Sequence, residues 1–317
     1  MMNLTINGKK IKAKEGDTIL QVARDNGIHI PTLCSNDALE PYGACRLCIV
    51  EVKSGRMTTL EASCTYPVAE AIDVSTDSDE VMKARKLVLE LLLARCPNVK
   101  IIKELAAEYG IEKASDYLSL ENEYCVLCGL CVRACHEVVQ TDAISFSGSG
   151  KDKKVESPFG LEAENCIGCG SCAFVCPTGI IKVREIEHAT ENMPAGEVEI
   201  GPERMIENWN RNLKHQVCKI SGNHFAPEFM LNRFKETMLL SNQFFDISPS
   251  YREYPEVDED QCIGCGACLD ECPVGAIRLR EREDKEIRSN IMPTHCCGCQ
   301  TCLMYCVRSA IKVPETA

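Results

Sequence analysis

The stretch that decides the fold is NEYCVLCGLCVRACHEVVQ, residues 122–140. Its four cysteines follow the spacing C-x2-C-x2-C-x3-C, at Cys125, Cys128, Cys131 and Cys135. Thiolates are soft, electron-rich ligands, and sets of four hold iron–sulfur clusters. A single zinc ion is more often held by two cysteine pairs that lie farther apart. The spacing therefore favours a polynuclear iron–sulfur cluster over zinc.

The same motif occurs four times in the chain, as two pairs. The copies span residues 125–135, 166–176, 262–272 and 296–306. In two-cluster bacterial ferredoxins the first three cysteines of a motif hold one cluster, and the fourth serves the neighbouring cluster. This rule predicts four [4Fe–4S] ligand sets: Cys125, Cys128, Cys131 and Cys176; Cys166, Cys169, Cys172 and Cys135; Cys262, Cys265, Cys268 and Cys306; and Cys296, Cys299, Cys302 and Cys272.

The N-terminal cysteines have a different spacing. Cys34, Cys45, Cys48 and Cys64 read C-x10-C-x2-C-x15-C, a longer first loop than in the plant-type [2Fe–2S] pattern. The surrounding sequence predicts a hairpin, a crossing helix, a ligand loop and a strand, which suits a β-grasp domain. Gly43 leaves room for a loop that wraps closely around a cluster. We therefore expect one [2Fe–2S] cluster here.

The local patterns predict an α+β fold in five parts. Alternating residues turn at Asn7-Gly8, a helix begins at Asp17 or Thr18, and residues 79–118 are helical with a break at Pro97. Two further helices are expected near residues 203–213 and 227–240. The predicted parts are 1–77, a [2Fe–2S] β-grasp domain; 78–118, a helical spacer; 119–186, a 2[4Fe–4S] ferredoxin-like domain; 187–254, a linker or docking segment; and 255–317, a second 2[4Fe–4S] domain.

Composition narrows the class of protein. The 317 residues include 23 cysteines, and 35 basic against 47 acidic residues give a net charge of −12. This charge argues against nucleic acid as a partner, because phosphates need a basic face. The N-terminus has no apolar signal core and no apolar run of about 18 residues occurs, so we expect a cytoplasmic protein with no membrane span.

Several possible metal ligands lie outside the predicted cluster sets, and we expect them to be ordinary core or surface residues. Cys96, Cys218 and Cys297 are single and are expected to be small buried hydrophobes; Cys297 falls out of register with its motif. His136 is expected on the surface, with cluster ligation and a hydrogen bond to cluster sulfur as open alternatives. We find no flavin or nicotinamide fingerprint and no nucleophile constellation. The sequence GSGKD at 148–152 is not a P-loop, because it lacks the first glycine of that motif.

At this point a family resemblance is visible. IPTLCSNDALEPYGACRLCIVEV, residues 30–52, resembles the N-terminal [2Fe–2S] domain of the large iron–sulfur subunit of respiratory complex I. It equally resembles the electron-transfer subunits of NAD-linked soluble hydrogenases, NAD-linked formate dehydrogenases and electron-bifurcating hydrogenases. The paired motifs up to about residue 185 are similar to the domain that follows in that family, and the last 60 or so residues resemble a generic two-cluster ferredoxin.

Two departures from the family pattern matter. Many relatives place a cluster held by one His and three Cys between these domains, whereas here that stretch contains Cys96 alone. The relatives' molybdopterin or diiron catalytic domains have no counterpart either. We therefore expect five clusters and no additional one in the spacer.

The resemblance implies a non-catalytic subunit of an anaerobic, cytoplasmic oxidoreductase complex. It leaves open whether that complex carries out electron bifurcation. Single electrons would pass between a flavoprotein that oxidises NAD(P)H and a downstream redox subunit. Two alternatives stay open: a redox enzyme subunit with its own flavin or substrate site in residues 187–254, and a structural zinc protein without redox chemistry.

Overall fold

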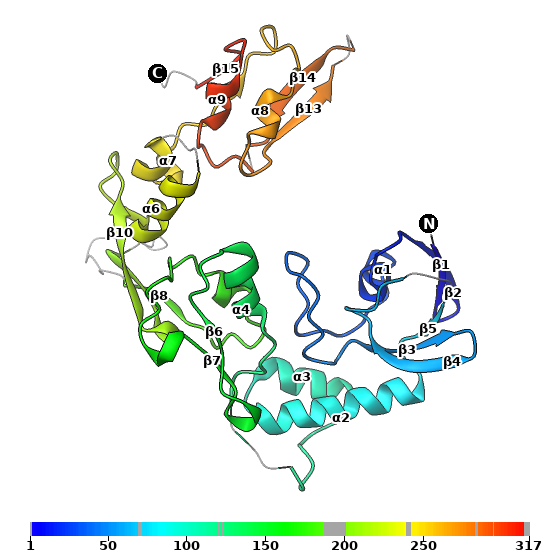
Figure 1. The fold of residues 1–317 in the computed structure, drawn as a ribbon. Helices are drawn as coiled ribbons and strands as arrows, with labels where there is room; N and C mark the ends of the chain where they lie inside the picture. Colours follow the sequence, from blue (N-terminus) through cyan, green and yellow to red (C-terminus); the bar gives the residue numbers. More distant parts are fainter. Residues whose placement is uncertain are drawn as a thin grey trace. The chain divides into compact units, whose positions relative to one another are not determined.

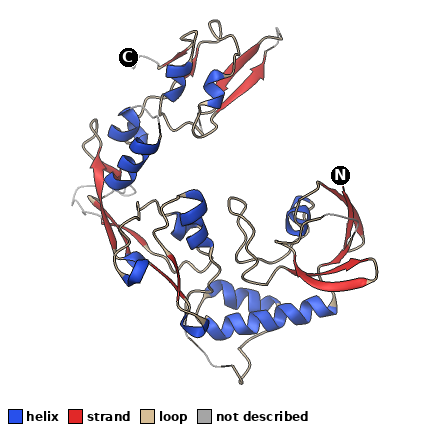
Figure 2. Cartoon of the chain, viewed as in Figure 1, coloured by secondary structure: helices blue, strands red, loops and turns tan. Residues whose placement is uncertain are grey.

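The computed structural model describes residues 2–68, 72–118, 121, 123–186, 201–238, 242–282, 285–293 and 295–313. Groups of helices and groups of strands follow one another along the chain, as Figures 1 and 2 show. The chain divides into two compact units. Unit 1 comprises residues 1–166, 170–182 and 207–210, and unit 2 comprises residues 167–169, 183–206 and 211–317.

A five-stranded sheet opens unit 1. Its strand order is β2-β1-β5-β3-β4, with β1 and β5 parallel. The strands are β1 (Met2–Ile6), β2 (Lys9–Ala13), β3 (Ile49–Ser54), β4 (Met57–Ala62) and β5 (Asp73–Ser75). The predicted turn is confirmed: Asn7 and Gly8 both adopt positive φ, 50° and 79°, as a two-residue type I′ hairpin requires.

The helix α1 (Ile19–Asp25) covers one face of this sheet. It begins where the sequence indicates, because Thr18 accepts from the Gln21 N–H and the Gln21 side chain accepts from the Thr18 N–H, a complete capping box. The buried side chains of α1 join the inward-facing residues of the strands in one core. That core includes Leu4, Ile6, Ile11, Ile19, Leu20, Val22, Val50, Val52 and Val74.

The spacer consists of α2 (Asp79–Arg95) and α3 (Lys100–Glu108), as predicted. Ser78 caps α2 by accepting from the Val81 N–H at 3.4 Å. The buried Arg85 ties α2 to the sheet, since its guanidinium donates to the Ile49 carbonyl at 2.6 Å and to the Tyr109 hydroxyl at 3.2 Å. The spacer is therefore held on the [2Fe–2S] domain by hydrogen bonds as well as apolar packing.

The paired cysteine motifs of unit 1 build short elements around their loops. These are α4 (Leu130–Arg133), the π-helical turn Ala134–Val138, β6 (Ser145–Ser147), β7 (Lys154–Glu156) and α5 (Ser171–Phe174). Three further turns are 3₁₀-helical, at Gly150–Asp152, Pro158–Gly160 and Glu207–Trp209. Gly129 and Gly170 precede α4 and α5 with φ of 78° and 77°, a left-handed conformation that glycine adopts at low cost.

Unit 2 begins with a four-stranded antiparallel sheet in the order β11-β10-β9-β8. Its strands are β8 (Val183–Ile186), β9 (Glu203–Ile206), β10 (Arg211–Val217) and β11 (His224–Pro227). The helix expected near residues 203–213 is wrong. The chain reverses at Asn210, whose φ is 48°, and β10 then buries the alternate residues Leu213 and His215.

Two helices follow this sheet, α6 (Glu228–Thr237) and α7 (Asn242–Asp246). The helix expected near residues 227–240 is confirmed over 228–237, while its last two positions lie outside the described residues. A 3₁₀ turn at Pro249–Tyr251 leads to the last domain. The first part of the predicted linker, residues 187–200, also lies outside the described residues.

The C-terminal part of unit 2 repeats one pattern twice, a short helix inside each cysteine motif and a strand after it. The elements are β12 (Glu256–Val257), α8 (Ala267–Asp270), β13 (Ile277–Glu281), β14 (Ile287–Ile291), α9 (Thr301–Tyr305) and β15 (Ile311–Lys312). The strands β12 and β15 pair, as do β13 and β14. In the described part of the chain, no helix combines the length and apolarity needed to cross a bilayer.

Candidate metal centres

The four N-terminal cysteines come together in one buried place. The Sγ atoms of Cys34 and Cys45 lie 3.3 Å apart, and the Cys48 and Cys64 thiols hydrogen-bond to each other. All four side chains are buried, and the charges of Cys34, Cys45 and Cys48 all act on Cys64. The hydrogen bond from Cys45 lowers the pKa of Cys34 to about 6, and the bond from Cys64 does the same for Cys48. This convergence fits a four-thiolate cluster.

The sheet positions these thiols. Cys34 and Cys45 lie on the long loop after α1, while Cys48 immediately precedes β3 and Cys64 follows β4. Backbone N–H groups already point at sulfur, since Leu33 N–H donates to Cys45 Sγ at 3.4 Å and Cys45 N–H to Cys34 Sγ at 3.3 Å. Such bonds stabilise thiolate charge and tune cluster potential.

The first [4Fe–4S] set lines one cavity. Cys125, Cys128, Cys131 and Cys176 all face a cavity of about 190 Å³. Cys125, Cys128 and Cys176 are also among the charges that act on Cys131. Burial raises the pKa of Cys128 to about 11. Cys176 thus shares a cavity with the first three cysteines of the other motif, a geometry that fits a shared cubane.

The second set is divided between the two units. Cys135, Cys166 and Cys172 belong to unit 1 and Cys169 to unit 2. The Cys135 sulfur accepts from the Ala143 N–H at 3.3 Å and lies 3.3 Å from the Thr141 hydroxyl. This ligand set stays a prediction.

The third set lines a smaller cavity in the C-terminal domain. Cys262, Cys265, Cys268 and Cys306 face a cavity of about 20 Å³, again with the fourth cysteine supplied by the other motif. Ser289 contributes twice, because its N–H donates to Cys262 Sγ at 3.4 Å and its hydroxyl lies 3.2 Å from Cys268 Sγ. Two hydrogen-bonding groups on β14 therefore serve this set.

The thiols of the fourth set interact electrostatically with one another and also with the third set. Burial is the largest cause that raises the pKa of Cys302 to about 12, and the charges of Cys299, Cys296, Cys268 and Cys272 add to it, so this ligand set stays a prediction. Donors to these sulfurs are the Ala276 N–H to Cys272 at 3.2 Å, the Gly298 N–H to Cys296 at 3.4 Å and the Thr301 hydroxyl to Cys299 at 3.3 Å. Among the described residues, no three His, Cys, Asp or Glu side chains are close enough for a single metal ion. A four-iron cluster is larger than a single ion, so its cysteine ligands can lie farther apart and are recognised by the cavity that they line.

The remaining cysteines differ from one another. Cys96 and Cys218 are buried, as expected, with exposed fractions of 0% and 1%. Cys297 is only half-buried and its thiol hydrogen-bonds with Cys299, so the expectation of a buried hydrophobe is wrong for this residue. His136 is exposed and its Nδ1 lies 2.6 Å from the Asp142 carboxylate, which matches the surface interpretation.

A contact that the sequence does not reveal joins the [2Fe–2S] domain to the first cubane cavity. Arg133 on α4 donates to the Cys34 carbonyl at 2.9 Å and to the Glu40 carbonyl, and its guanidinium stacks on the Tyr42 ring at 5.1 Å. Leu33, Cys34, Cys45 and Leu47 also share one buried cluster with α2, α3, Val126, Cys128 and Leu130. Two thiols of the predicted [2Fe–2S] set, Cys34 and Cys45, therefore share one apolar core with Cys128 of the first cubane set.

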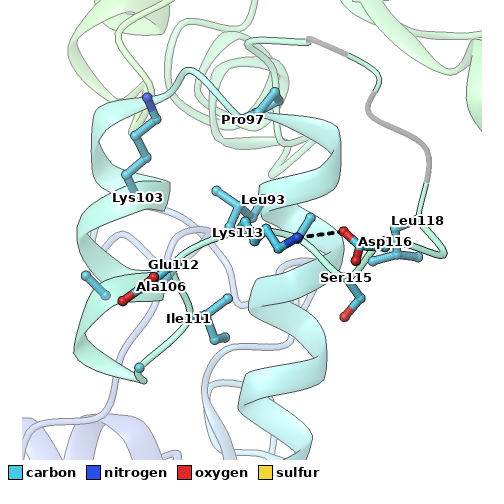
Figure 3. A pocket seen from close by; sticks show the side chains of 13 residues that line it. Leu93, Pro97, Lys103, Ala106, Ile111, Glu112, Lys113, Ser115, Asp116 and Leu118 are labelled. Carbon is cyan, nitrogen blue, oxygen red and sulfur yellow. Dashed lines mark hydrogen bonds and ion pairs between the residues drawn. The ribbon is translucent and has the colours of Figure 1, made fainter.

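A further cavity lies in the spacer. It measures about 840 Å³ and is lined by residues of α2, α3 and the loop up to Leu118. Figure 3 shows the Lys113–Asp116 ion pair, 2.8 Å long, at its edge. No cysteine is among the described residues that line it, so this cavity gives no support to a metal site.

Three segments match known domain families. Residues 1–79 match the 2Fe-2S iron-sulfur cluster binding domain, residues 109–180 the 4Fe-4S dicluster domain, and residues 255–278 the 4Fe-4S binding domain. The chain therefore carries one 2Fe-2S domain and two 4Fe-4S domains.

Curated proteins with similar sequences are subunits of NAD(P)-linked oxidoreductases. NADPH-Fe(3+) oxidoreductase subunit alpha of Geobacter sulfurreducens is 32% identical over 57% of this chain and 24% of its own length. The mitochondrial NADH-ubiquinone oxidoreductase 78 kDa subunit of Candida albicans is 30% identical over 49% of this chain and 25% of its own. NAD-reducing hydrogenase HoxS subunit gamma of Cupriavidus necator is 26% identical over 58% of this chain and 88% of its own.

The fold and the thiol sets thus define a multi-domain iron–sulfur protein. More particularly, parts of the chain are similar in sequence to subunits of NAD- and NADP-reducing hydrogenases and of NADH-ubiquinone oxidoreductase. It spans about a quarter of the length of the Geobacter and Candida relatives.

Proposed function

We propose that the chain relays single electrons through five iron–sulfur clusters. The observation that carries the proposal is the shared cavity of Cys125, Cys128, Cys131 and Cys176, which joins the two motifs of a ferredoxin pair. The equivalent cavity in the C-terminal domain supports the same ligand exchange between motifs. The cofactors would be one [2Fe–2S] and four [4Fe–4S] clusters, held by the five sets of four cysteines predicted from the sequence.

In finer detail, we assign residues 1–77 to a β-grasp domain, 78–118 to the spacer, and 119–186 and 255–317 to two-cubane ferredoxin-like domains. The sheet order and the covering helix α1 support the first assignment. In the described part of 201–254, the strands β9, β10 and β11 and the helices α6 and α7 support a folded module over an extended linker. We retain a docking role for this module.

The partners we propose are a flavoprotein that oxidises NAD(P)H and a downstream redox subunit, in a cytoplasmic complex. The names of the relatives support an NAD(P)-linked assembly. Within the relay, the contact of Arg133 with the Cys34 loop supports electron exchange between the [2Fe–2S] cluster and the first cubane, because Cys34 and Cys45 share one buried core with Cys128.

The first test is the metal content of the chain purified anaerobically. Five loaded sites require about 18 iron atoms, two from one cluster and sixteen from four cubanes. A value of about 14 would remove one cubane from the proposal, and a dominant zinc content would end it.

The second test separates a relay from an enzyme. The isolated flavin-free chain should be reduced by dithionite but should not catalyse NADH–dye turnover, and NADH should reduce it once the flavoprotein is added. Steady NADH–dye turnover by the isolated chain would instead indicate a flavin or substrate site of its own. Deleting residues 255–317 should leave NADH reduction of the other clusters intact; loss of that reduction would mean that electrons enter at the C-terminal domain.

A further inference from the structure

Two arginines of the module 201–254 reach equivalent cysteine loops. The third position of each C-x2-C loop is glycine in both cases, Gly168 before Cys169 and Gly298 before Cys299. Arg204 donates to the carbonyl of Gly168 at 2.7 Å. Arg252 donates to the carbonyl of Cys297, one residue earlier in its loop, at 2.9 Å. The module therefore supplies a guanidinium to one loop of each cubane pair.

The Arg252 guanidinium is held on every side by main chain and by a ring. Besides Cys297, it donates to the carbonyls of Ile247 and Phe244, both at 3.0 Å. Its Cζ lies 4.4 Å from the centre of the Phe244 ring. Only 9% of the residue is exposed. A planar fork fixed by three carbonyls cannot swing away from the loop without breaking several bonds.

The packing against the cysteine loop is tight. A Cβ built on Gly298 would lie 2.9 Å from the Cβ of Arg252 and 3.4 Å from the Tyr254 ring, so the loop backbone touches the arginine directly. The charges of the Cys297 and Cys299 thiols are among those that act on the guanidinium. Arg252 is thus a close neighbour of the set Cys296, Cys299, Cys302 and Cys272.

The two arginines differ in how their charge is balanced. Arg204 forms an ion pair with Glu185, whose Oε1 lies 2.7 Å from Nε and 2.5 Å from Nη2. For Arg252, no carboxylate within ion-pair distance is found in the described part of the chain, and its hydrogen bonds to Ile247, Cys297 and Phe244 all end on neutral carbonyl oxygens. A buried charge without a counter-ion acts over a longer range than a neutralised one.

We propose that Arg252 is a positioning residue that keeps an unbalanced positive charge beside the cubane of Cys296, Cys299, Cys302 and Cys272 and raises its reduction potential. Reduction adds one electron to the cluster, and a fixed positive charge nearby favours the more negative state. The inference rests on the proposed function, because it requires that these cysteines hold a cubane.

The test is an anaerobic redox titration of the full, iron-loaded chain, followed by the EPR signals of its reduced clusters. R252Q removes the charge, and R252K keeps the charge while losing the planar fork. We expect R252Q to lower the ratio of reduced to oxidised cluster for one C-terminal cubane about tenfold at the wild-type midpoint, about 59 mV for one electron. R252K should stay close to wild type.

R204Q is the matched control. Arg204 contacts an equivalent loop, and its charge is already neutralised by Glu185. It should leave both C-terminal midpoint potentials unchanged. Unchanged potentials in iron-loaded R252Q, or equal shifts in R252Q and R252K, would overturn the role of the charge. Should R252Q lose iron, R252M serves as a second neutral variant: a lowered potential of one C-terminal cubane supports the proposal, and a wild-type potential overturns it. Failure of the wild-type chain to bind iron would instead refute the proposed function.

Discussion

Replacing Cys176 by alanine tests whether the motifs exchange their fourth ligand. Cys176 lines the same cavity as Cys125, Cys128 and Cys131, although its own motif begins at Cys166. In this geometry, C176A removes one of the four thiolates from the first cubane. A cubane that loses a thiolate can shed up to its four irons, so the iron content should fall from about 18 toward about 14 atoms per chain.

Double variants turn this assignment into an iron count that needs no spectroscopic identification of the clusters. If Cys125 and Cys176 hold the same cubane, C125A/C176A damages one cluster and retains about 14 irons. C166A/C176A then damages two clusters and retains about 10. The iron losses caused by two substitutions are thus strongly non-additive when both ligands belong to one cluster, and they add when the ligands belong to different clusters.

The assay is iron and acid-labile sulfide per chain after anaerobic reconstitution, with C96A as the control. Cys96 is buried, but it is a single cysteine outside every predicted set, so C96A should keep the wild-type iron content. The reverse pattern, about 10 irons in C125A/C176A and about 14 in C166A/C176A, would refute ligand exchange and return Cys176 to its own motif.

Three further outcomes concern stability and are measured by thermal unfolding of the iron-loaded chain. Arg133→Ala should lower the free energy of unfolding by about 1–3 kcal/mol, because it leaves carbonyls of the [2Fe–2S] loop without their charged donor. The control Arg24→Ala breaks an ion pair that is largely exposed, so it should lower the free energy of unfolding by less than about 1 kcal/mol. Equal losses in the two variants would contradict this reasoning. Gly168→Ala should lower the free energy of unfolding by about 1–3 kcal/mol more than Gly170→Ala does. Both glycines have positive φ, but only a Cβ on residue 168 would meet a leucine side chain, at 2.4 Å. A larger loss for Gly170→Ala would be the contrary result. Cys96→Ala should destabilise by about 1 kcal/mol through the loss of one buried sulfur, and a loss of several times that amount would indicate a further role for the thiol.

The sequence predicted those elements whose signals are local. The hairpin at Asn7-Gly8 needs two residues that tolerate positive φ, and the helix at Thr18 carries its own capping box. The cysteine spacing likewise predicted the 2Fe-2S and 4Fe-4S domains, because the ligand pattern reflects the geometry of the cluster. The domain matches confirm both types of domain.

The strands β9 and β10 escaped prediction because their stability is not local. Residues 203–217 are mostly polar, and the buried residues of the two strands in this stretch are Ile206, Leu213 and His215. Three such residues are too few to produce the alternation of apolar and polar residues that predicts a strand. Pairing with β8 and β11 decides the conformation instead. The tight turn at Asn210 was the one local sign, since asparagine is enriched at positive φ.

Arg133 and Arg252 share one further property: each donates to main-chain oxygens. Arg133 bonds to the carbonyls of Cys34 and Glu40, and Arg252 to three more. Every residue type supplies a carbonyl oxygen, so the side chains at these acceptor positions can change during evolution without loss of the bond. Correlated substitution, which reveals side-chain pairs in families of sequences, should therefore leave no trace of these contacts, and only the arginines themselves should persist.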